Sequence, residues 1–306
     1  MKLLILGCGL LGCSVAMAAR AAGAAKSIVG FDPDAASVAS ARQLDAFDSV
    51  SLLHDPADLS KADWPNADIA VVAGPPSSLA DGVERLAAVA ELVLDVGSVK
   101  VPVLSALEER GRVPAHFVPC HPMAGSHLAG GLAAQANLFR DRWVFVAAEA
   151  TTDPAAQARA HEFWRALGAR TTDLSPAEHD AAVAYTSHLP HLLAAVYAGL
   201  ADVVPAAAGP GFRDFSRLAR ANPALWADIL RTNRGHILPL VEKLQEALTE
   251  ARALLAQHEP TDAASQDRLL DYLAARKAEL DQLDQTDRAQ GRRRTDHIEH
   301  NAKDGQ

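Results

Sequence analysis

The sequence predicts an α/β protein with a Rossmann-type, doubly wound and mostly parallel sheet, followed by an all-α helical domain. Three observations support this prediction. Short apolar runs alternate with Ala-rich stretches over residues 1–174, which is typical of parallel strands covered by helices. A glycine-rich motif follows the first of these runs. After residue 174 the strand patterns stop, and helical patterns continue to about residue 284.

The individual elements follow from apolar runs and from helix start signals. Strands are expected at residues 2–6, 27–31, 68–73, 92–95, 117–120 and 143–147, with a further one near 169–172. Helices are expected at residues 10–22, 77–90, 99–110 and 153–167, the last with Asp153 as N-cap and Pro154 in its first turn. Ser175 and Glu178 form a capping-box pattern that begins the helical region.

The expected domains are a dinucleotide-binding domain at 1–174, a helical substrate and dimerisation domain at 175–285, and a flexible polar tail at 286–306. The run from Ala181 to Leu200 is too apolar for one solvated helix, so it should pack in a bundle or against a second subunit, and a homodimer is expected. The tail contains Arg292, Arg293 and Arg294 but almost no large apolar side chain. A solvated end is favoured over a contact with an anionic partner.

Composition excludes several classes of function. The net charge of −9 argues against a nucleic-acid surface, because phosphate binding needs clustered Lys and Arg. Three cysteines without a Cys-x-x-Cys pair indicate neither disulfides nor a thiolate metal site, which fits a reducing cytoplasm. The apolar start of the chain could be a secretory signal, but its regularly spaced glycines favour a strand and helix. No stretch predicts a membrane span.

The most specific pattern is Gly7-Cys8-Gly9-Leu10-Leu11-Gly12, between the first expected strand and helix. These glycines permit a tight turn, close approach of a pyrophosphate and close helix packing, and the helix N-terminus faces the phosphates. Asp32 ends the second expected strand twenty residues after Gly12. A carboxylate there hydrogen-bonds the ribose hydroxyls and repels a 2′-phosphate. The pattern predicts NAD as cofactor and favours it over NADP; a packing turn with a capping Asp is the alternative.

Two further strand ends should face the same crevice. Gly74 and Pro75 follow a central strand and are predicted to line the cofactor site, although an ordinary loop is the alternative. Ser98 lies in the motif Asp95-Val96-Gly97-Ser98-Val99-Lys100 at the next strand end, where open α/β sheets bind their ligands. Ser98 is therefore predicted to be close to the cofactor. It could also cap a helix that begins at Val99, and the two roles can coexist.

His121 follows the expected strand at 117–120, and Pro122 restrains the backbone so that the imidazole is presented to the crevice. Because imidazole accepts a proton near neutral pH, His121 is predicted to be a general base. No lysine occurs between Lys100 and Lys243. Histidine is therefore the available acid or base.

Asp180, His188 and His191 form a polar set in an otherwise apolar run, and one helix, kinked at Pro190, could bring them to one face. A substrate pocket is favoured over satisfied polar groups in a core. No metal site is expected, because the two histidines lack a convincing carboxylate partner.

Five arginines lie within twenty-two residues that contain only two acids, Asp214 and Asp228. Guanidinium groups bind carboxylates in a bidentate manner, so this segment predicts a small anionic substrate; a solvated helix face is the alternative. The five are Arg213, Arg217, Arg220, Arg231 and Arg234.

The chain resembles the prephenate and arogenate dehydrogenases, the cyclohexadienyl dehydrogenases of tyrosine biosynthesis, over most of residues 1–280. The motifs GCGLLGCS, DVGSVK, HPMAGS, EHD through SHLPH, and GFRDFSRLA followed by Trp226 occur in that family's order. The resemblance implies oxidation of a ring C4 hydroxyl, with hydride passing to NAD and loss of carbon dioxide as the ring becomes aromatic. The product is 4-hydroxyphenylpyruvate from prephenate, or tyrosine from arogenate.

The resemblance also implies roles for individual residues. His121 would accept the hydroxyl proton, Ser98 would orient His121 and contact the nicotinamide, and Arg217 would bind a substrate carboxylate. His191 would meet the substrate side chain. The remaining implied pocket residues are His188, Asp180, Gly211, Asp214 and Trp226.

One position departs from the family pattern, since His127 stands six residues after His121, where the family often has Glu. A carboxylate would favour the ammonium group of arogenate, and an imidazole does so less. Prephenate is therefore the favoured substrate, and His127 is a candidate specificity residue. The alternatives are arogenate or dual specificity and, more distantly, a β-hydroxyacid-type dehydrogenase or a non-catalytic NAD-binding module.

Overall fold

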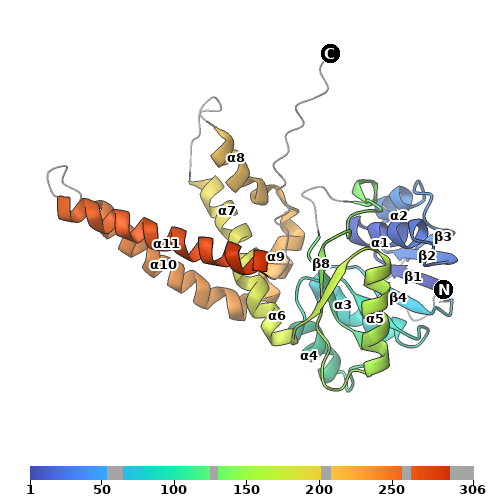
Figure 1. Ribbon diagram of the computed structural model, residues 1–306. Helices are drawn as coiled ribbons and strands as arrows, with labels where there is room; N and C mark the ends of the chain where they lie inside the picture. Colours follow the sequence, from blue (N-terminus) through green and yellow to red (C-terminus); the bar gives the residue numbers. More distant parts are fainter. Residues whose placement is uncertain (54–64, 125–129, 201–207, 257–262, 290–306) are drawn as a thin grey trace, which may run out of the picture. The chain divides into compact units, whose positions relative to one another are not determined.

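The computed structural model describes residues 1–53, 65–124, 130–200, 208–256 and 263–289 (Figure 1). The contacts divide the chain into two compact units, Met1–Leu240 and Val241–Gln306, and the sites described below lie in the first. The candidate residue His127 and the arginines at 292–294 lie outside the described residues.

A six-stranded parallel sheet forms the centre of the first unit, in the order β3-β2-β1-β4-β5-β6. Side chains of β1 alternate between its faces. Leu3 and Ile5 pack in the same apolar cluster as residues of α1 and α5, whereas Leu4 and Leu6 pack with residues of α3 and α4. Helices thus cover both faces, as the doubly wound prediction requires. The strands are β1 (Lys2–Leu6), β2 (Ser27–Asp32), β3 (Ser49–Leu52), β4 (Ile69–Val72), β5 (Val93–Asp95) and β6 (Phe117–Val118).

A second, three-stranded sheet differs from the single sheet that was expected. Its order is β7-β8-β9, with β7 (Cys120–Pro122) antiparallel to β8 (Trp143–Val146) and β8 parallel to β9 (Arg170–Asp173). The expected strand at 117–120 is divided at Pro119 between the two sheets. Proline has no N–H to continue a ladder, and its carbonyl instead accepts a bond from Ala147 N. His121 therefore lies on a strand of the second sheet.

The helices of the dinucleotide-binding region begin where the sequence signals placed them, within a few residues. They are α1 (Leu10–Ala21), α3 (Pro76–Leu86), α4 (Val101–Glu109) and α5 (Pro154–Ala166). The Asp153 side chain caps α5 by accepting from Ala155 N. The short helix α2 (Ala35–Ala41) and strand β3 were not predicted; Asp34 caps α2, a signal that the apolar pattern alone did not reveal.

The helical region begins with the predicted capping box, in which Ser175 and Glu178 bond each other's backbone N–H. Asp180, His188 and His191 do not share one regular helix, because a π-helical turn, η3 (Ala184–His188), separates α6 from α7. Pro190 is in the first turn of α7, where proline is tolerated. The elements here are α6 (Pro176–Val183), η3, α7 (Leu189–Gly199), α8 (Pro210–Ser216), η5 (Arg217–Arg220), α9 (Pro223–Thr232) and α10 (Arg234–Ala256).

The second unit consists of the later part of α10 and helix α11 (Ala263–Ala289). Leu248, Leu255, Leu273 and Leu280 are exposed on these helices. Within the described residues, no helix is long and apolar enough to cross a membrane.

Candidate active site

A cavity of about 490 Å³ opens at the carboxyl ends of β1, β4, β5 and β7. Its walls include the predicted cofactor residues Gly9, Leu10, Leu11, Gly74 and Pro75. Ser98, His121 and Trp226 line the same cavity. Residues from both predicted domains therefore surround one space.

The glycine loop has the shape that a bound pyrophosphate needs. Gly7 has φ of +101°, and a Cβ there would lie 2.4 Å from the carbonyl oxygen of Ala73. At Gly12 a Cβ would lie 1.9 Å from the carbonyl oxygen of Gly7, so only glycine lets the helix approach the loop. A Cβ on Gly9 would meet nothing within 4 Å, and Gly9 is the N-cap of α1 without a side-chain cap. The N–H groups at the N-terminus of α1 are thus available to phosphate oxygens.

Asp32 is held at the end of β2 beside this loop. Its carboxylate accepts hydrogen bonds from Cys8 N at 2.6 Å and from Asp34 N at 2.7 Å. Burial raises the pKa of Asp32 above its usual value, while the two backbone bonds act in the opposite direction. The remaining lone pairs of the carboxylate can accept from ribose hydroxyls. These residues fit an adenine dinucleotide without a 2′-phosphate.

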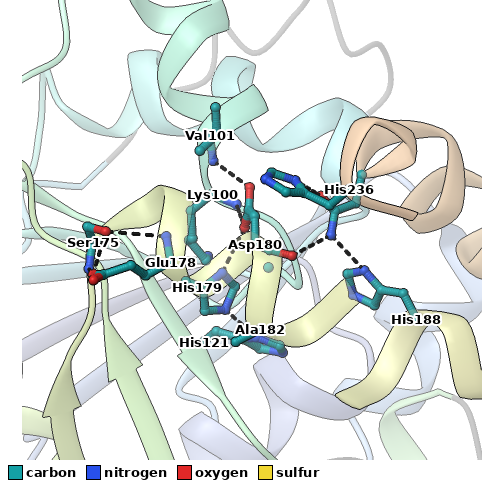
Figure 2. A network of polar contacts seen from close by, with 12 residues as sticks. Lys100, Val101, His121, Ser175, Glu178, His179, Asp180, Ala182, His188 and His236 are labelled. Carbon is teal, nitrogen blue, oxygen red and sulfur yellow. Dashed lines mark hydrogen bonds and ion pairs between the residues drawn. The ribbon is translucent and has the colours of Figure 1, made fainter. Parts of the chain in front are cut away.

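A chain of three buried side chains leads away from the cavity (Figure 2). His121 Nδ1 lies 2.8 Å from His179 Nε2, and His179 Nδ1 lies 2.7 Å from Asp180 Oδ1. Asp180 also accepts from Lys100 N at 2.8 Å and Val101 N at 2.9 Å. Since an ionised carboxylate only accepts, His179 must carry its proton on Nδ1. His179 Nε2 is then the acceptor of a proton on His121 Nδ1.

These tautomers leave a lone pair on His121 Nε2, the nitrogen that proton abstraction requires. Burial lowers the pKa of His121 well below its usual value, and His179, Lys100 and His188 lower it further. Burial likewise lowers the pKa of His179, although its bond to Asp180 opposes the shift. Both rings are therefore neutral near pH 7, and His121 can act as an acceptor.

Asp180 caps helix α4 rather than lining the cavity, where the sequence had placed it among the pocket residues. It is buried, and its two carboxylate oxygens accept from the backbone N–H groups at the start of α4. A carboxylate at a helix N-terminus is stabilised by the helix dipole. Ser98 does not cap this helix, because the helix begins at Val101, two residues later than expected.

A buried ion pair supports the strand that carries His121. Lys100 Nζ contacts the carboxylate of Asp95, and both side chains are 0% exposed. Lys100 Nζ also donates to the carbonyl oxygen of Cys120 at 2.6 Å, while Asp95 Oδ1 accepts from Cys120 N at 2.9 Å. The pair thus holds both backbone polar groups of the residue preceding His121.

His188 and His191 occupy two different surroundings. His191 stacks on Trp226 with ring centroids 3.4 Å apart, and Trp226 lines the cavity. His188 is buried, meets the edge of Trp226, and lies 3.0 Å from Asn233 Nδ2 through its Nδ1. Burial lowers the pKa of His188 to about 4. The structure therefore places His191 closer than His188 to a surface that a ligand can reach.

The arginine segment lies beside this group of aromatic rings. Arg217 begins η5 and is exposed, and its charge contributes to lowering the pKa of His191. Gly211 and Asp214 are exposed on α8. None of these three residues lines the described cavity. Their roles in substrate binding stay predictions.

The sequence analysis did not select His179, Lys100, Asp95 or Asn233 as site residues. His179 lies in the EHD motif, and Asp95 and Lys100 both lie in the DVGSVK motif. No local pattern tells that His179 meets His121 fifty-eight residues earlier, or that the backbone N–H of Lys100 bonds Asp180 eighty residues later. The resemblance implied that Ser98 orients His121. In the structure His179 bonds His121 Nδ1, while Ser98 shares the cavity wall with His121.

Comparison with known proteins assigns both halves of the chain. Residues 15–173 match the model of the prephenate dehydrogenase nucleotide-binding domain, and residues 175–275 match that of the prephenate dehydrogenase dimerisation domain. The chain is 30% identical to prephenate dehydrogenase of Bacillus subtilis over 268 residues, which are 84% of this chain and 71% of the relative. It is 34% identical to cyclohexadienyl dehydrogenase of Zymomonas mobilis over 55% of this chain and 60% of that one.

A solved structure of prephenate dehydrogenase from Aquifex aeolicus, in complex with hydroxyphenyl propionate and NAD+, superposes with a TM-score of 0.79. It is 25% identical, and the match covers 92% of this chain and 98% of that one. The predicted Rossmann-type and helical architecture is confirmed by this likeness and by the strand order. The chain is a dehydrogenase that belongs to the prephenate dehydrogenase family.

Proposed function

We propose that this enzyme oxidises prephenate to 4-hydroxyphenylpyruvate and carbon dioxide, with NAD as the hydride acceptor. The supporting observation is the buried chain from Asp180 through His179 to His121, which ends at the wall of the cavity beside the glycine loop. Two relatives also support the proposal: the B. subtilis relative is a prephenate dehydrogenase, and the Aquifex structure contains NAD+.

The residues can perform the proton steps of this reaction. His121 Nε2 accepts the proton of the C4 hydroxyl as the hydride leaves C4, and NAD supplies the hydride acceptor when bound. The ring carboxylate then leaves as carbon dioxide, and its bonding electron pair completes the aromatic ring. His121 returns the proton to the phenolate oxygen, so the histidine ends unchanged. Throughout, His179 and Asp180 hold the His121 ring through its Nδ1 and stabilise its protonated form.

Recognition of the dianionic substrate is assigned to the helical region. The guanidinium of Arg217 would bind a substrate carboxylate, with His191 at the side chain and Ser98 near the nicotinamide, as the family resemblance implies. Trp226, stacked on His191, supplies an apolar wall for the ring. His188, Gly211, Asp214 and His127 complete the proposed pocket.

The choice between prephenate and arogenate is tested by measuring kcat/KM for both substrates, each with NAD and with NADP. We expect prephenate with NAD to be the best combination, because His127 lacks the negative charge that favours the arogenate ammonium. A preference for arogenate would support the alternative activity. Turnover of 3-hydroxy acids with no turnover of either cyclohexadienyl compound would contradict the proposed function.

Asp32 is the residue on which the cofactor prediction depends. Asp32→Asn is expected to raise KM for NAD by about 10- to 150-fold, since a hydrogen bond to a charged group contributes about 1.5–3 kcal/mol. KM for NADP should rise less or fall, because the repulsion of a 2′-phosphate is removed. Initial-rate measurements with both cofactors check this. An unchanged ratio of the two kcat/KM values would show that Asp32 does not select the cofactor.

Three further expectations belong to the same proposal. The helical region forms a homodimer, supported by exposed apolar side chains on α7, at its C-cap and on α8, namely Val196, Tyr197, Leu200 and Phe215. The division into domains at 1–174 and 175–285, with a polar tail at 286–306, is retained. A reducing cytoplasmic location is supported by three cysteines that are all free and buried.

A further inference from the structure

We propose that Asn233 is a positioning residue for the active site, whose side-chain amide joins the backbone of Asp180 to the ring of His188 and keeps that ring neutral with its proton on Nε2. This inference rests on the proposed function. Asn233 follows the last residue of α9 and is 2% exposed. It is not part of the cavity wall.

The amide of Asn233 makes three side-chain hydrogen bonds. Its Nδ2 donates to the carbonyl oxygen of Asp180 at 2.9 Å and lies 3.0 Å from His188 Nδ1. Its Oδ1 lies 2.9 Å from His236 Nδ1. Figure 2 labels the three residues that these bonds join, Asp180, His188 and His236.

Chemistry determines which end of the amide faces Asp180. A backbone carbonyl oxygen only accepts, so the atom that faces it must be the Nδ2 donor. The second N–H of the same group then points at His188, and His188 Nδ1 must accept it. His236 in turn donates from its Nδ1 to Oδ1. No exchange of the amide oxygen and nitrogen satisfies these contacts.

The consequence for His188 is a fixed tautomer. Protonation at Nδ1 would place two N–H groups against each other, and this conflict opposes the cationic ring. The titratable groups around His188 are Asp180, His179 and His191, together with His121. Burial is the first cause that lowers the pKa of His188 to about 4. Nε2 of His188 then carries a proton and has no hydrogen-bond partner among the described residues.

The bond from Asn233 to the carbonyl oxygen of Asp180 supports the helix at an irregular turn. The carbonyl oxygen of Asp180 accepts from Ala184 N within the helix and from Asn233 Nδ2. The π-helical turn η3 begins at Ala184 and ends at His188. Such turns depart from regular hydrogen bonding and often occur at functional sites. Asn233 thus bonds both ends of the segment that carries Asp180 and His188.

Loss of the Asn233 bonds should affect the base, His121, through the charge of His188 as well as through its position. A cationic His188 would lie near His179 and His121, whose pKa values would fall further. It also meets Trp226, which packs against His191 at the cavity. Asn233 therefore acts on the reaction without touching the substrate.

The test compares Asn233→Asp with Asn233→Ala. A carboxylate at 233 accepts a hydrogen bond from a protonated His188 Nδ1 and repels the Asp180 carbonyl oxygen, whereas alanine only removes the bonds. Titration of protein labelled with ¹⁵N-histidine follows His188, whose signal the His188→Gln variant assigns. We expect Asn233→Asp to move the His188 titration from about 4 to above its ordinary value of about 6.5. Asn233→Ala should move it upward by less.

Kinetics supplies the second measurement. Asn233→Asp should lower kcat for prephenate at least 10-fold at pH 7.5, with less than a 2-fold change in KM for NAD, and the loss should grow as the pH falls through the new His188 titration. Asn137→Asp makes the same change at an exposed position and should alter neither measurement.

Two results would overturn the proposal: an unchanged His188 titration in both variants, or equal losses of kcat in both without pH dependence. If Asn233→Asp does not fold, the alanine variant decides through the same titration. The titration needs no substrate. A wild-type enzyme that turns over neither prephenate nor arogenate would therefore refute the proposed function, while the His188 titration still decides the role of Asn233.

Discussion

Replacing His121 with Asn is expected to lower kcat/KM for prephenate by about 10²- to 10⁴-fold, the contribution typical of a positioned general base. Asparagine retains an N–H that can donate to His179, but it has no lone pair in place of His121 Nε2 that can take a proton near pH 7. Binding of NAD should be nearly unchanged, because the glycine loop and Asp32 are separate from β7. Steady-state kinetics and titration with NAD measure the two effects independently.

His116→Asn is the matched control for this change. His116 is partly buried and its Nε2 contacts the carbonyl oxygen of Ala87, away from the cavity wall. Its replacement should leave turnover within about 2-fold, as a polar change outside the reacting groups. If His121→Asn kept the wild-type rate, the base would have to be another group, and the chain from Asp180 through His179 to His121 would have no catalytic role.

Lys100→Met is expected to destabilise the protein by about 3–5 kcal/mol, because it leaves the Asp95 carboxylate buried without its cation. It also removes the bond from Lys100 Nζ to the carbonyl oxygen of Cys120. Urea unfolding followed by tryptophan fluorescence measures the loss as a lower midpoint. The strand that carries His121 loses a support, so turnover should fall in the folded fraction as well.

The double variant Asp95→Asn with Lys100→Met separates charge from packing. Neutralising both partners removes the unpaired charge, so at least half of the lost stability should return. The control is Arg110→Met at the opposite end of α4, whose ion pair with Asp81 is 41% and 48% exposed. Such exposed pairs contribute about 0–1 kcal/mol. Equal losses for Lys100→Met and Arg110→Met would contradict the importance assigned to the buried pair.

The cofactor side of this enzyme could be predicted from local sequence. Gly7, Gly9 and Gly12 act through backbone conformation and close approach within one turn, and the capping pattern of Ser175 and Glu178 acts within one helix turn. Apolar periodicity likewise reports which face of a strand or helix is buried. Periodicity did not predict the break at Pro119. The apolar run at 117–120 was recognised as one strand, but the structure divides it between two sheets.

The residues around the proposed base depended instead on contacts between distant segments. Asp180 caps a helix that begins about eighty residues earlier, and His179 meets a ring fifty-eight positions away. The candidate residues taken from motifs therefore included His121 and Asp180, but the motifs could not show that His179 joins them through hydrogen bonds. The π-helical turn added a second difference, since Asp180, His188 and His191 do not share one regular helix.

By itself the sequence determined the Rossmann-type and helical architecture, the dinucleotide loop and a candidate imidazole at His121, because each depends on backbone preferences and spacing over a few residues. It placed His121 after a strand, whereas the structure places it within β7. Only the tertiary structure decided how that imidazole is held, through His179 and Asp180 on one side and the Asp95–Lys100 pair on the other. The physical reason is that folding decides both how deeply the ring is buried, which is the main cause of its lowered pKa, and which polar groups lie within hydrogen-bonding distance, which set its tautomer.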